Sequence, residues 1–365
     1  MSALFDKIHG CEAAGTIGNA MGDPVEGMAW EKIEDQYGFL EDFLAQEKTD
    51  RVRSQTYGSD WHYHAHHRPP GTTEDGMERH KLCTSAIINK NGRITIEDLA
   101  ATWLSDIDPD KFGYLMGPQD RVIYNQIVFG VPPWEVGRHA SWPAFIGTSK
   151  MIQPVGMVNA CNPRQAAQDA LELGQLKDMR GVKGNYALEV CAGIAAGVAE
   201  ALRSSASRNS VIEEVLSHLT QEPLKEVTEG LDRAKGADSW KEMRPFYAEK
   251  YAGRPISNAV EVLSGGLACF YLADGNPKDA ILYAVNLGRD TDCKAYVAGG
   301  LAGALRGIEE IPEEWVTIVD EASKNDPWTV STRTTGEAAE GLYEACMNEV
   351  QRMEGVLAEV KGQMQ

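Results

Sequence analysis

The chain has 365 residues, 43% of them hydrophobic, and a formal net charge of -19. This length allows a sizeable core, and the acidic balance argues against a nucleic-acid binder or a protein drawn to anionic membrane surfaces. No stretch approaches the ~20 apolar residues that span a bilayer, the first residues show no signal-peptide pattern, and the seven scattered cysteines predict reduced thiols and a cytoplasmic location.

In the first half of the chain, residues 4–22 predict a helix with a small-residue face, followed by a loop rich in Pro and Gly. Residues 30–68 are polar and aromatic and predict a loop-rich segment. A second helix is expected from Thr72–Met77 to about Ile88, and a third over 95–105 with Thr95 as its cap. The Pro/Trp-rich residues 131–143 predict another loop.

In the second half, helical patterns follow one another with few interruptions. We expect helices over 162–173, 186–202, 210–219, 223–233, 260–272, 277–285, 294–307 and 336–361. Strand-like alternation is nearly absent. The sequence therefore predicts an all-α fold, with one compact domain over 1–365 and the loop-rich segments 30–68 and 131–143 flanking a cleft.

The stretch Asn286–Gly307 organises this arrangement. Gly288 ends one helix, and Asp290 and Asp292 follow on a short turn that we expect to be exposed. The next helix places Gly299, Gly303 and Gly307 on one face. Because each glycine costs a helix interior about 1 kcal/mol relative to alanine, these positions predict that another backbone approaches closely.

The two aspartates of this turn have two interpretations. Acidic residues and threonine are favoured at helix starts, so the turn can simply cap its helix. Oxygen-rich clusters also bind hard cations. A second such cluster, Thr73-Glu74-Asp75, begins another helix, and together the two clusters would suit one or two Mg²⁺ or Mn²⁺ ions.

Three motifs carry a resemblance to a known family. They are Gly18-Asn19-Ala20-Met21-Gly22-Asp23-Pro24-Val25-Glu26, Thr73-Glu74-Asp75-Gly76, and Gly288-Arg289-Asp290-Thr291-Asp292-Cys293 with the Ala/Gly-rich helix after it. In residue type, order and spacing they make the sequence similar to the ADP-ribosylglycohydrolases, the family typified by the glycohydrolase that reactivates ADP-ribosylated dinitrogenase reductase.

The resemblance implies an all-α fold around a dinuclear magnesium or manganese centre that cleaves the bond between ribose C1 and a nitrogen or oxygen leaving group. By motif position, the metal residues would be Thr73, Glu74, Asp75, Asp290, Asp292 and Cys293. Glu26, in the loop that closes over the metals, and Asp75 would manage protons. The implied substrate is ADP-ribosylated protein or a smaller ADP-ribose compound, with a nucleoside-like N-glycoside as the alternative.

Four positions depart from the family pattern. Glu74 replaces Asp, Gly76 removes a hydroxyl, Asn19 removes a charge, and Cys293 replaces a threonine ligand by a thiol, which is a poor partner for magnesium. These departures predict that one metal position is weakened. They also motivate an alternative function, a catalytically degenerate member that binds a ribosyl ligand without turnover.

The segment expected beside the substrate is Gly147-Thr148-Ser149-Lys150. Lys150 is its only cation, so the bidentate arginine capture that suits a diphosphate is not offered here. This predicts a substrate smaller than ADP-ribosylated protein.

Four histidines gather at His62, His64, His66 and His67. In an extended strand, three of them would share a side and could hold zinc. The alternatives are a plain surface loop, or a loop wall that contacts substrate through residues such as Trp61 and His66. Trp61, Tyr63 and Trp134 could also stack on a planar group.

Overall fold

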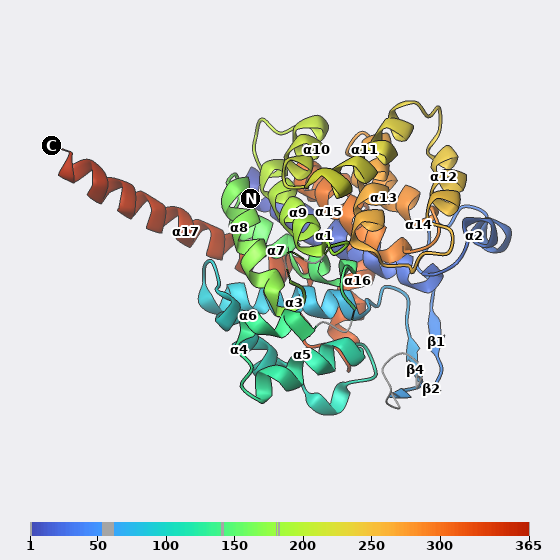
Figure 1. The fold of residues 1–365 in the computed structure, drawn as a ribbon, viewed down its shortest axis with the longest axis horizontal. Helices are drawn as coiled ribbons and strands as arrows, with labels where there is room; N and C mark the ends of the chain where they lie inside the picture. The colour runs from blue at the N-terminus through green and yellow to red at the C-terminus, as the bar shows by residue number, and fades with distance from the viewer. Residues whose placement is uncertain (1, 53–61, 140–141, 180, 182, 365) are drawn as a thin grey trace.

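The computed structural model describes residues 2–52, 62–139, 142–179, 181 and 183–364. Helices make up nearly all of its regular structure and pack into one body, with the few short strands at one edge (Figure 1). The all-α, single-domain prediction is confirmed. Among the described residues, no helix is long and apolar enough to cross a membrane.

Two helices form the centre of this body: α1 (Ala3–Gly22) and α15 (Thr291–Arg306). Nearly every residue of α15 is buried. A Cβ atom added to Gly10 would lie 2.5 Å from the carbonyl oxygen of Gly303 and 2.6 Å from the carbonyl carbon of Gly307. The predicted close approach of a second backbone is therefore confirmed, and α1 is the helix that makes it.

The remaining helices surround this pair. They are α2 (Trp30–Tyr37), α3 (Asp75–Lys90), α4 (Ile96–Asp106), α5 (Pro118–Val128), α6 (Pro133–Val136), α7 (Gln153–Val158), α8 (Pro163–Leu173), α9 (Ala187–Ala201), α10 (Arg208–Ser217), α11 (Gln221–Lys235), α12 (Met243–Lys250), α13 (Ala259–Leu272), α14 (Pro277–Val285), α16 (Glu313–Asn325) and α17 (Thr335–Gln363). All the predicted helices are present. Thr95 caps α4 with a capping box completed by Asp98.

Several elements were not predicted. Helices α2 and α6 lie inside the two segments expected to be loop, 30–68 and 131–143, and α5, α7, α12 and α16 also went unpredicted. In α16, Trp315, Val319 and Ala322 are buried at the spacing of one helical face. The surrounding acidic residues make that pattern weak in the sequence.

The strands are also confined to the segment 30–68. Strand β1 (Gln46–Lys48) pairs antiparallel with β4 (His66–Arg68), with Glu47 opposite His67. Strand β2 (Arg51–Val52) pairs with β3 (His62–Tyr63). The four paired strands of this segment form a two-stranded arm beside the helical body (Figure 1).

Helix α17 leaves the body altogether. Its first half packs through residues such as Leu342 and Cys346, whereas residues 351–364 are all exposed and project away (Figure 1). Met353, Val356 and Val360 lie exposed on this projecting half.

Candidate functional site

A cleft of about 480 Å³ opens between the arm and the helical body. One wall carries Tyr63 and His66 from the arm, and another carries Trp142 and Phe145. The volume of the cleft and its mix of aromatic and polar groups suit a small organic ligand. Trp134, by contrast, lines a different surface depression.

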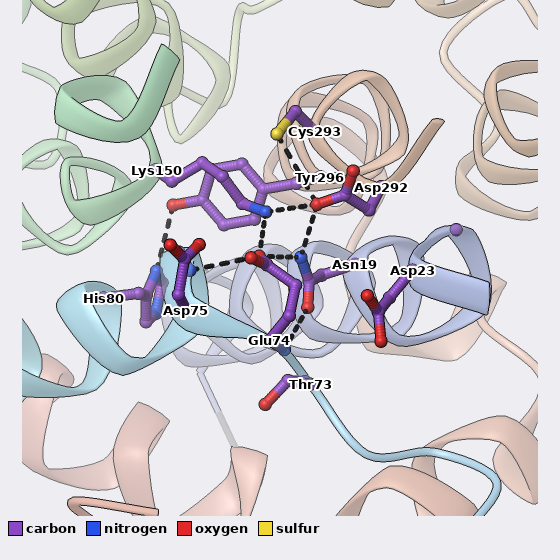
Figure 2. Close-up of polar contacts among 12 residues, drawn as sticks. Asn19, Asp23, Thr73, Glu74, Asp75, His80, Lys150, Asp292, Cys293 and Tyr296 are labelled. Carbon is purple, nitrogen blue, oxygen red and sulfur yellow. Dashed lines mark hydrogen bonds and ion pairs between the residues drawn. The ribbon is translucent and has the colours of Figure 1, made fainter. Parts of the chain in front are cut away.

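The carboxylates predicted as functional gather at the bottom of this cleft, where Glu26, Glu74, Asp75 and Asp292 all line it. Figure 2 shows Glu74, Asp75 and Asp292 converging from the start of α3 and from α15, with Asn19 of α1 beside Glu74 and joined to Glu74 and Asp292 by dashed lines. The motifs of three distant segments are thus brought to one place.

The turn before α15 is buried, contrary to the expectation that it is exposed. Asp290 and Asp292 are 0% and 1% exposed, because the end of α1 packs against them. A Cβ at Gly22 would lie 2.5 Å from the Asp292 nitrogen. The Thr291 hydroxyl donates to the Gly22 carbonyl oxygen at 2.8 Å and fixes the turn to α1.

Asp290 caps α15 with one carboxylate oxygen and leaves the other without a hydrogen bond. Its Oδ1 accepts from the Cys293 backbone N–H at 3.2 Å, which is the capping role. Among the described residues, its buried Oδ2 and the buried Oδ1 of Asp292 have no hydrogen-bond partner. Two buried carboxylate oxygens without a donor are costly, so these atoms point to a cation.

Glu74 caps α3 and meets Asp292 through shared donors. Its Oε1 accepts from the Gly76 N–H at 3.1 Å and from Asn19 Nδ2 at 2.8 Å. The Lys150 ammonium forms a short ion pair with the same Oε1 and contacts Asp292 Oδ2 at 2.6 Å (Figure 2). Lys150, predicted to face the substrate, thus lies with its charge between two carboxylates.

These carboxylates outnumber the cations beside them. Burial opposes the charge on Lys150, but Asp292 and Glu74 outweigh it and raise the pKa of this lysine well above its ordinary value. Burial, together with the carboxylates of Glu26 and Asp290, still raises the pKa of Asp292 despite the ammonium. The raised pKa shows that these crowded carboxylates repel one another, a repulsion that a further cation would relieve.

Asp75 lies at the mouth of the site, 31% exposed, with an ion pair to Arg79 at 2.7 Å. Arg79 is itself buried and also contacts Asp120 at 2.6 Å. Neither Arg79 nor Asp120 was predicted as part of the site. The spacing of Asp75 and Arg79, four residues apart on α3, was the available signal.

Of the last two predicted metal residues, Thr73 lies apart from the carboxylates and Cys293 lies beside them. The Thr73 hydroxyl is 3.5 Å from Lys81 Nζ, and Figure 2 shows this residue apart from the carboxylate cluster. The Cys293 thiol lies 3.5 Å from Asp292 Oδ2. Burial and the carboxylate of Asp290 raise the pKa of this thiol well above its ordinary value, which keeps it protonated.

Glu26 occupies the loop after α1 and lines the cleft. Its side chain still reaches solvent there. Desolvation by the surrounding protein, together with the carboxylates of Asp290 and Glu74, raises its pKa to about 8. This direction favours the protonated form, which could donate a proton.

Of the other residues predicted to bind substrate, some line the cleft and some are buried away from it. Gly147 and His66 line the cleft. Thr148 is buried and donates to Asp178 Oδ2 at 2.6 Å, and Ser149 is buried beside it. Trp61 lies outside the described residues. Beneath Gly147 is Lys177, whose pKa burial lowers to about 8.

Two histidines of the arm, His64 and His66, pack against aromatic rings, and His67 pairs with Glu47. His64 stacks on Tyr114 with ring centroids 4.6 Å apart, and His66 meets the edge of Trp328 at 6.3 Å. Across the described part of the chain, the acidic, histidine and cysteine side chains close enough to share a metal are Asp290, Asp292 and Cys293. The zinc interpretation therefore gains no support from these imidazoles.

The residues present fit a divalent cation at the start of α15. Asp290, Asp292 and Cys293 each offer an atom within 4.8 Å of the others, and each aspartate also has one buried oxygen without a hydrogen-bond partner among the described residues. Buried carboxylates suit Mg²⁺ or Mn²⁺.

Comparisons with known proteins identify the family and the fold. The family model for ADP-ribosylglycohydrolases matches residues 1–351. The ADP-ribosyl-[dinitrogen reductase] glycohydrolase of Rhodospirillum rubrum is 32% identical over 77 residues, which are 21% of this chain and 26% of that protein, so the chain matches about a quarter of that relative's length. An uncharacterized protein of Archaeoglobus fulgidus is 23% identical over 86% of this chain and 91% of its own. A solved ADP-ribosylglycohydrolase-related protein complex matches 95% of this chain and 100% of its own, with a TM-score of 0.65 at 19% identity, and thus shares the fold.

Proposed function

The chain belongs to the ADP-ribosylglycohydrolase family, and from this premise we propose that it is a metal-dependent hydrolase that cleaves an N- or O-ribosyl bond. The observation that carries the proposal is the pair of unpartnered buried oxygens, Asp290 Oδ2 and Asp292 Oδ1, in a turn whose Asp292 lines a cleft of about 480 Å³. A glycosidic substrate in this cleft would meet both a cation site and carboxylates able to move protons.

The reaction needs a water oxygen to bond to ribose C1 while the bond to the leaving atom breaks. Asp290 and Asp292 would hold the ion, which supplies a Lewis acid and orients oxygen ligands. Asp75 lies at the mouth of the site. Burial and the Glu74 carboxylate raise its pKa, so a bound cation would have to favour its ionised form before it could take a proton from water. Glu26, whose pKa is raised by burial and by the carboxylates of Asp290 and Glu74, would give a proton to the leaving nitrogen or oxygen.

Cys293 should limit the affinity for magnesium. We expect Cys293→Thr to tighten Mg²⁺ binding by roughly 10-fold, because a hydroxyl is a harder ligand than a thiol. Isothermal titration with Mg²⁺ measures this change, and Cys269→Thr, a buried cysteine of α13, is the control. Weaker or unchanged Mg²⁺ binding by Cys293→Thr would remove Cys293 from the metal site.

The cleft favours a substrate without a diphosphate. Four cationic side chains line it among the described residues, and each already meets an acceptor in the protein. Lys48 contacts Asp23 at 3.4 Å, and Arg68 donates to Thr72 Oγ1 at 3.2 Å. Arg79 and Lys150 hold carboxylates. Bidentate capture of phosphate would require one of these guanidinium groups to leave its partner.

We therefore expect simple ribonucleosides to be cleaved with a higher kcat/KM than ADP-ribosyl-arginine or ADP-ribosyl-serine peptides. The assay uses Mg²⁺ or Mn²⁺ and identifies the products by mass, which also tests the glycohydrolase proposal itself. Preference for the ADP-ribosyl peptides would reject the small substrate and leave the glycohydrolase standing. Absence of cleavage across the whole panel would reject both.

A second candidate function is a ribosyl-binding module without turnover. The observation that favours it is the Lys150 ammonium, which occupies the space between Glu74 and Asp292. Such a module would bind ADP-ribose or a nucleoside in a calorimeter and release no product in the same metal-supplemented assay. Product formation under those conditions eliminates it.

A further inference from the structure

The Lys150 ammonium occupies a position where a divalent ion could otherwise bridge two carboxylates. It forms an ion pair with Glu74 Oε1 and lies 2.6 Å from Asp292 Oδ2, and its side chain is 2% exposed. These oxygens come from α3 and α15 (Figure 2), so the contact joins two of the three motifs. A lysine buried this completely is stable only when its charge is paired.

Asn19 presents a donor to the same two oxygens. Its Nδ2 lies 2.8 Å from Glu74 Oε1 and 3.2 Å from Asp292 Oδ2. Its own Oδ1 accepts from the Glu74 backbone N–H at 3.2 Å, and this bond fixes which end of the amide faces the carboxylates. An N–H group aimed at this point opposes a metal ion there and suits an ammonium group.

Gly76 provides the space for the lysine. A Cβ added at this position would lie 2.5 Å from Lys150 Cδ and 2.8 Å from its Nζ. Two carboxylates hold the end of the lysine in place, so it could not move aside without losing an ion pair. The lysine thus requires the missing side chain at position 76.

The other oxygens of the cluster remain available. Asp290 Oδ2 and Asp292 Oδ1 are buried and, among the described residues, have no donor. The Cys293 thiol lies instead 3.5 Å from Asp292 Oδ2, the oxygen that Lys150 also contacts. The cluster therefore offers one position with unsatisfied carboxylate oxygens and one position already filled by a cation.

We infer that this chain binds a single divalent ion, at Asp290 and Asp292, and that the Lys150 ammonium takes the place of a second ion between Glu74 and Asp292. The inference rests on the proposed metal site and defines its composition. The four departures seen in the sequence share one cause, since Asn19, Glu74 and Gly76 accommodate the lysine and Cys293 adjoins it. Lys150 is thereby a positioning residue that holds Glu74 and Asp292 together.

Metal stoichiometry tests this inference without any substrate. Equilibrium dialysis against Mn²⁺ should give one ion per wild-type chain, with the electron paramagnetic resonance signal of isolated Mn²⁺. Lys150→Ala should bind two ions and show the signal of a magnetically coupled pair. Its melting temperature in EDTA should fall below that of the wild type, and Mn²⁺ should restore it. The double variant Lys150→Ala/Gly76→Thr fills the vacated space if the single variant does not fold without metal.

Lys177→Ala is the matched control, because Lys177 is also a buried lysine near the cleft but has no carboxylate partner among the described residues. It should keep one ion per chain. Two ions in the wild type would overturn the inference and leave the glycohydrolase proposal untouched. One ion or none in both Lys150 variants would also overturn it. One ion in the wild type without turnover of any ribosyl substrate would reject only the proposed function.

Discussion

Asp290→Asn should weaken the affinity for divalent ions by more than ~100-fold, and the rate of hydrolysis should fall with it. This loss exceeds the ~10–100-fold that typically follows mutation of a residue that only orients a metal ligand. Asparagine is nearly the same shape, and its side-chain oxygen can still accept the Cys293 N–H that Asp290 accepts at 3.2 Å. The cap of α15 therefore survives, while a neutral NH2 group replaces the unpartnered oxygen and its charge. This variant is preferable to Asp290→Ala, because the turn is buried and alanine would also remove the cap.

Mn²⁺ titration and a thermal melt in EDTA distinguish the two effects. Asp290→Asn should melt in EDTA close to the wild type, yet gain little stability from Mn²⁺. Asp108→Asn is the matched control, since Asp108 also accepts a backbone N–H, that of Asp110 at 3.0 Å, at a site away from the cleft. Full metal occupancy in Asp290→Asn would show that the unpartnered oxygen is not a ligand.

Gly10→Val should destabilise the protein by about 3 kcal/mol or more, the upper range for overpacking of a core. The valine Cβ would lie 2.5 Å from the Gly303 carbonyl oxygen and 2.6 Å from the Gly307 carbonyl carbon. Both obstacles are backbone, so no side chain can rotate away, and α1 would have to separate from α15. Because the end of α1 also seats the Asp290 turn through Gly22, metal affinity should weaken as well.

Urea unfolding followed by circular dichroism measures this loss. Gly355→Ala in the projecting part of α17 is the control, because nothing described lies within 4 Å of its added Cβ and alanine is the better helix former. That variant should unfold at the urea concentration of the wild type or slightly above it. A Gly10→Val protein as stable as the wild type would contradict the backbone contact between α1 and α15.

The sequence allowed the central helix and its acidic turn to be predicted, because glycine spacing and capping residues are local signals. Asp290 even shows that the two interpretations of the turn are compatible, with one oxygen capping and one unpartnered. The burial of Asp290 could not be predicted, because it comes from the packing of Gly22 at the end of α1. Gly22 is 269 residues away from Thr291, whose hydroxyl it accepts. Lys150 was noticed as a cation, but its partners Glu74 and Asp292 are 76 and 142 residues distant. Only the fold determines which acceptors a lysine meets.

The projecting half of α17 behaves differently from the rest of the molecule. Residues 351–363 make a helix about 20 Å long at 1.5 Å per residue, exposed on every side. An isolated helix of this length is marginal in water. Its amide hydrogens should therefore exchange through local fraying, at a rate set by the end of the helix and independent of the opening of the core. The last turns of α17 can unfold and re-form while α1 and α15 stay together. Unfolding of this projecting helix is therefore independent of unfolding at the cleft.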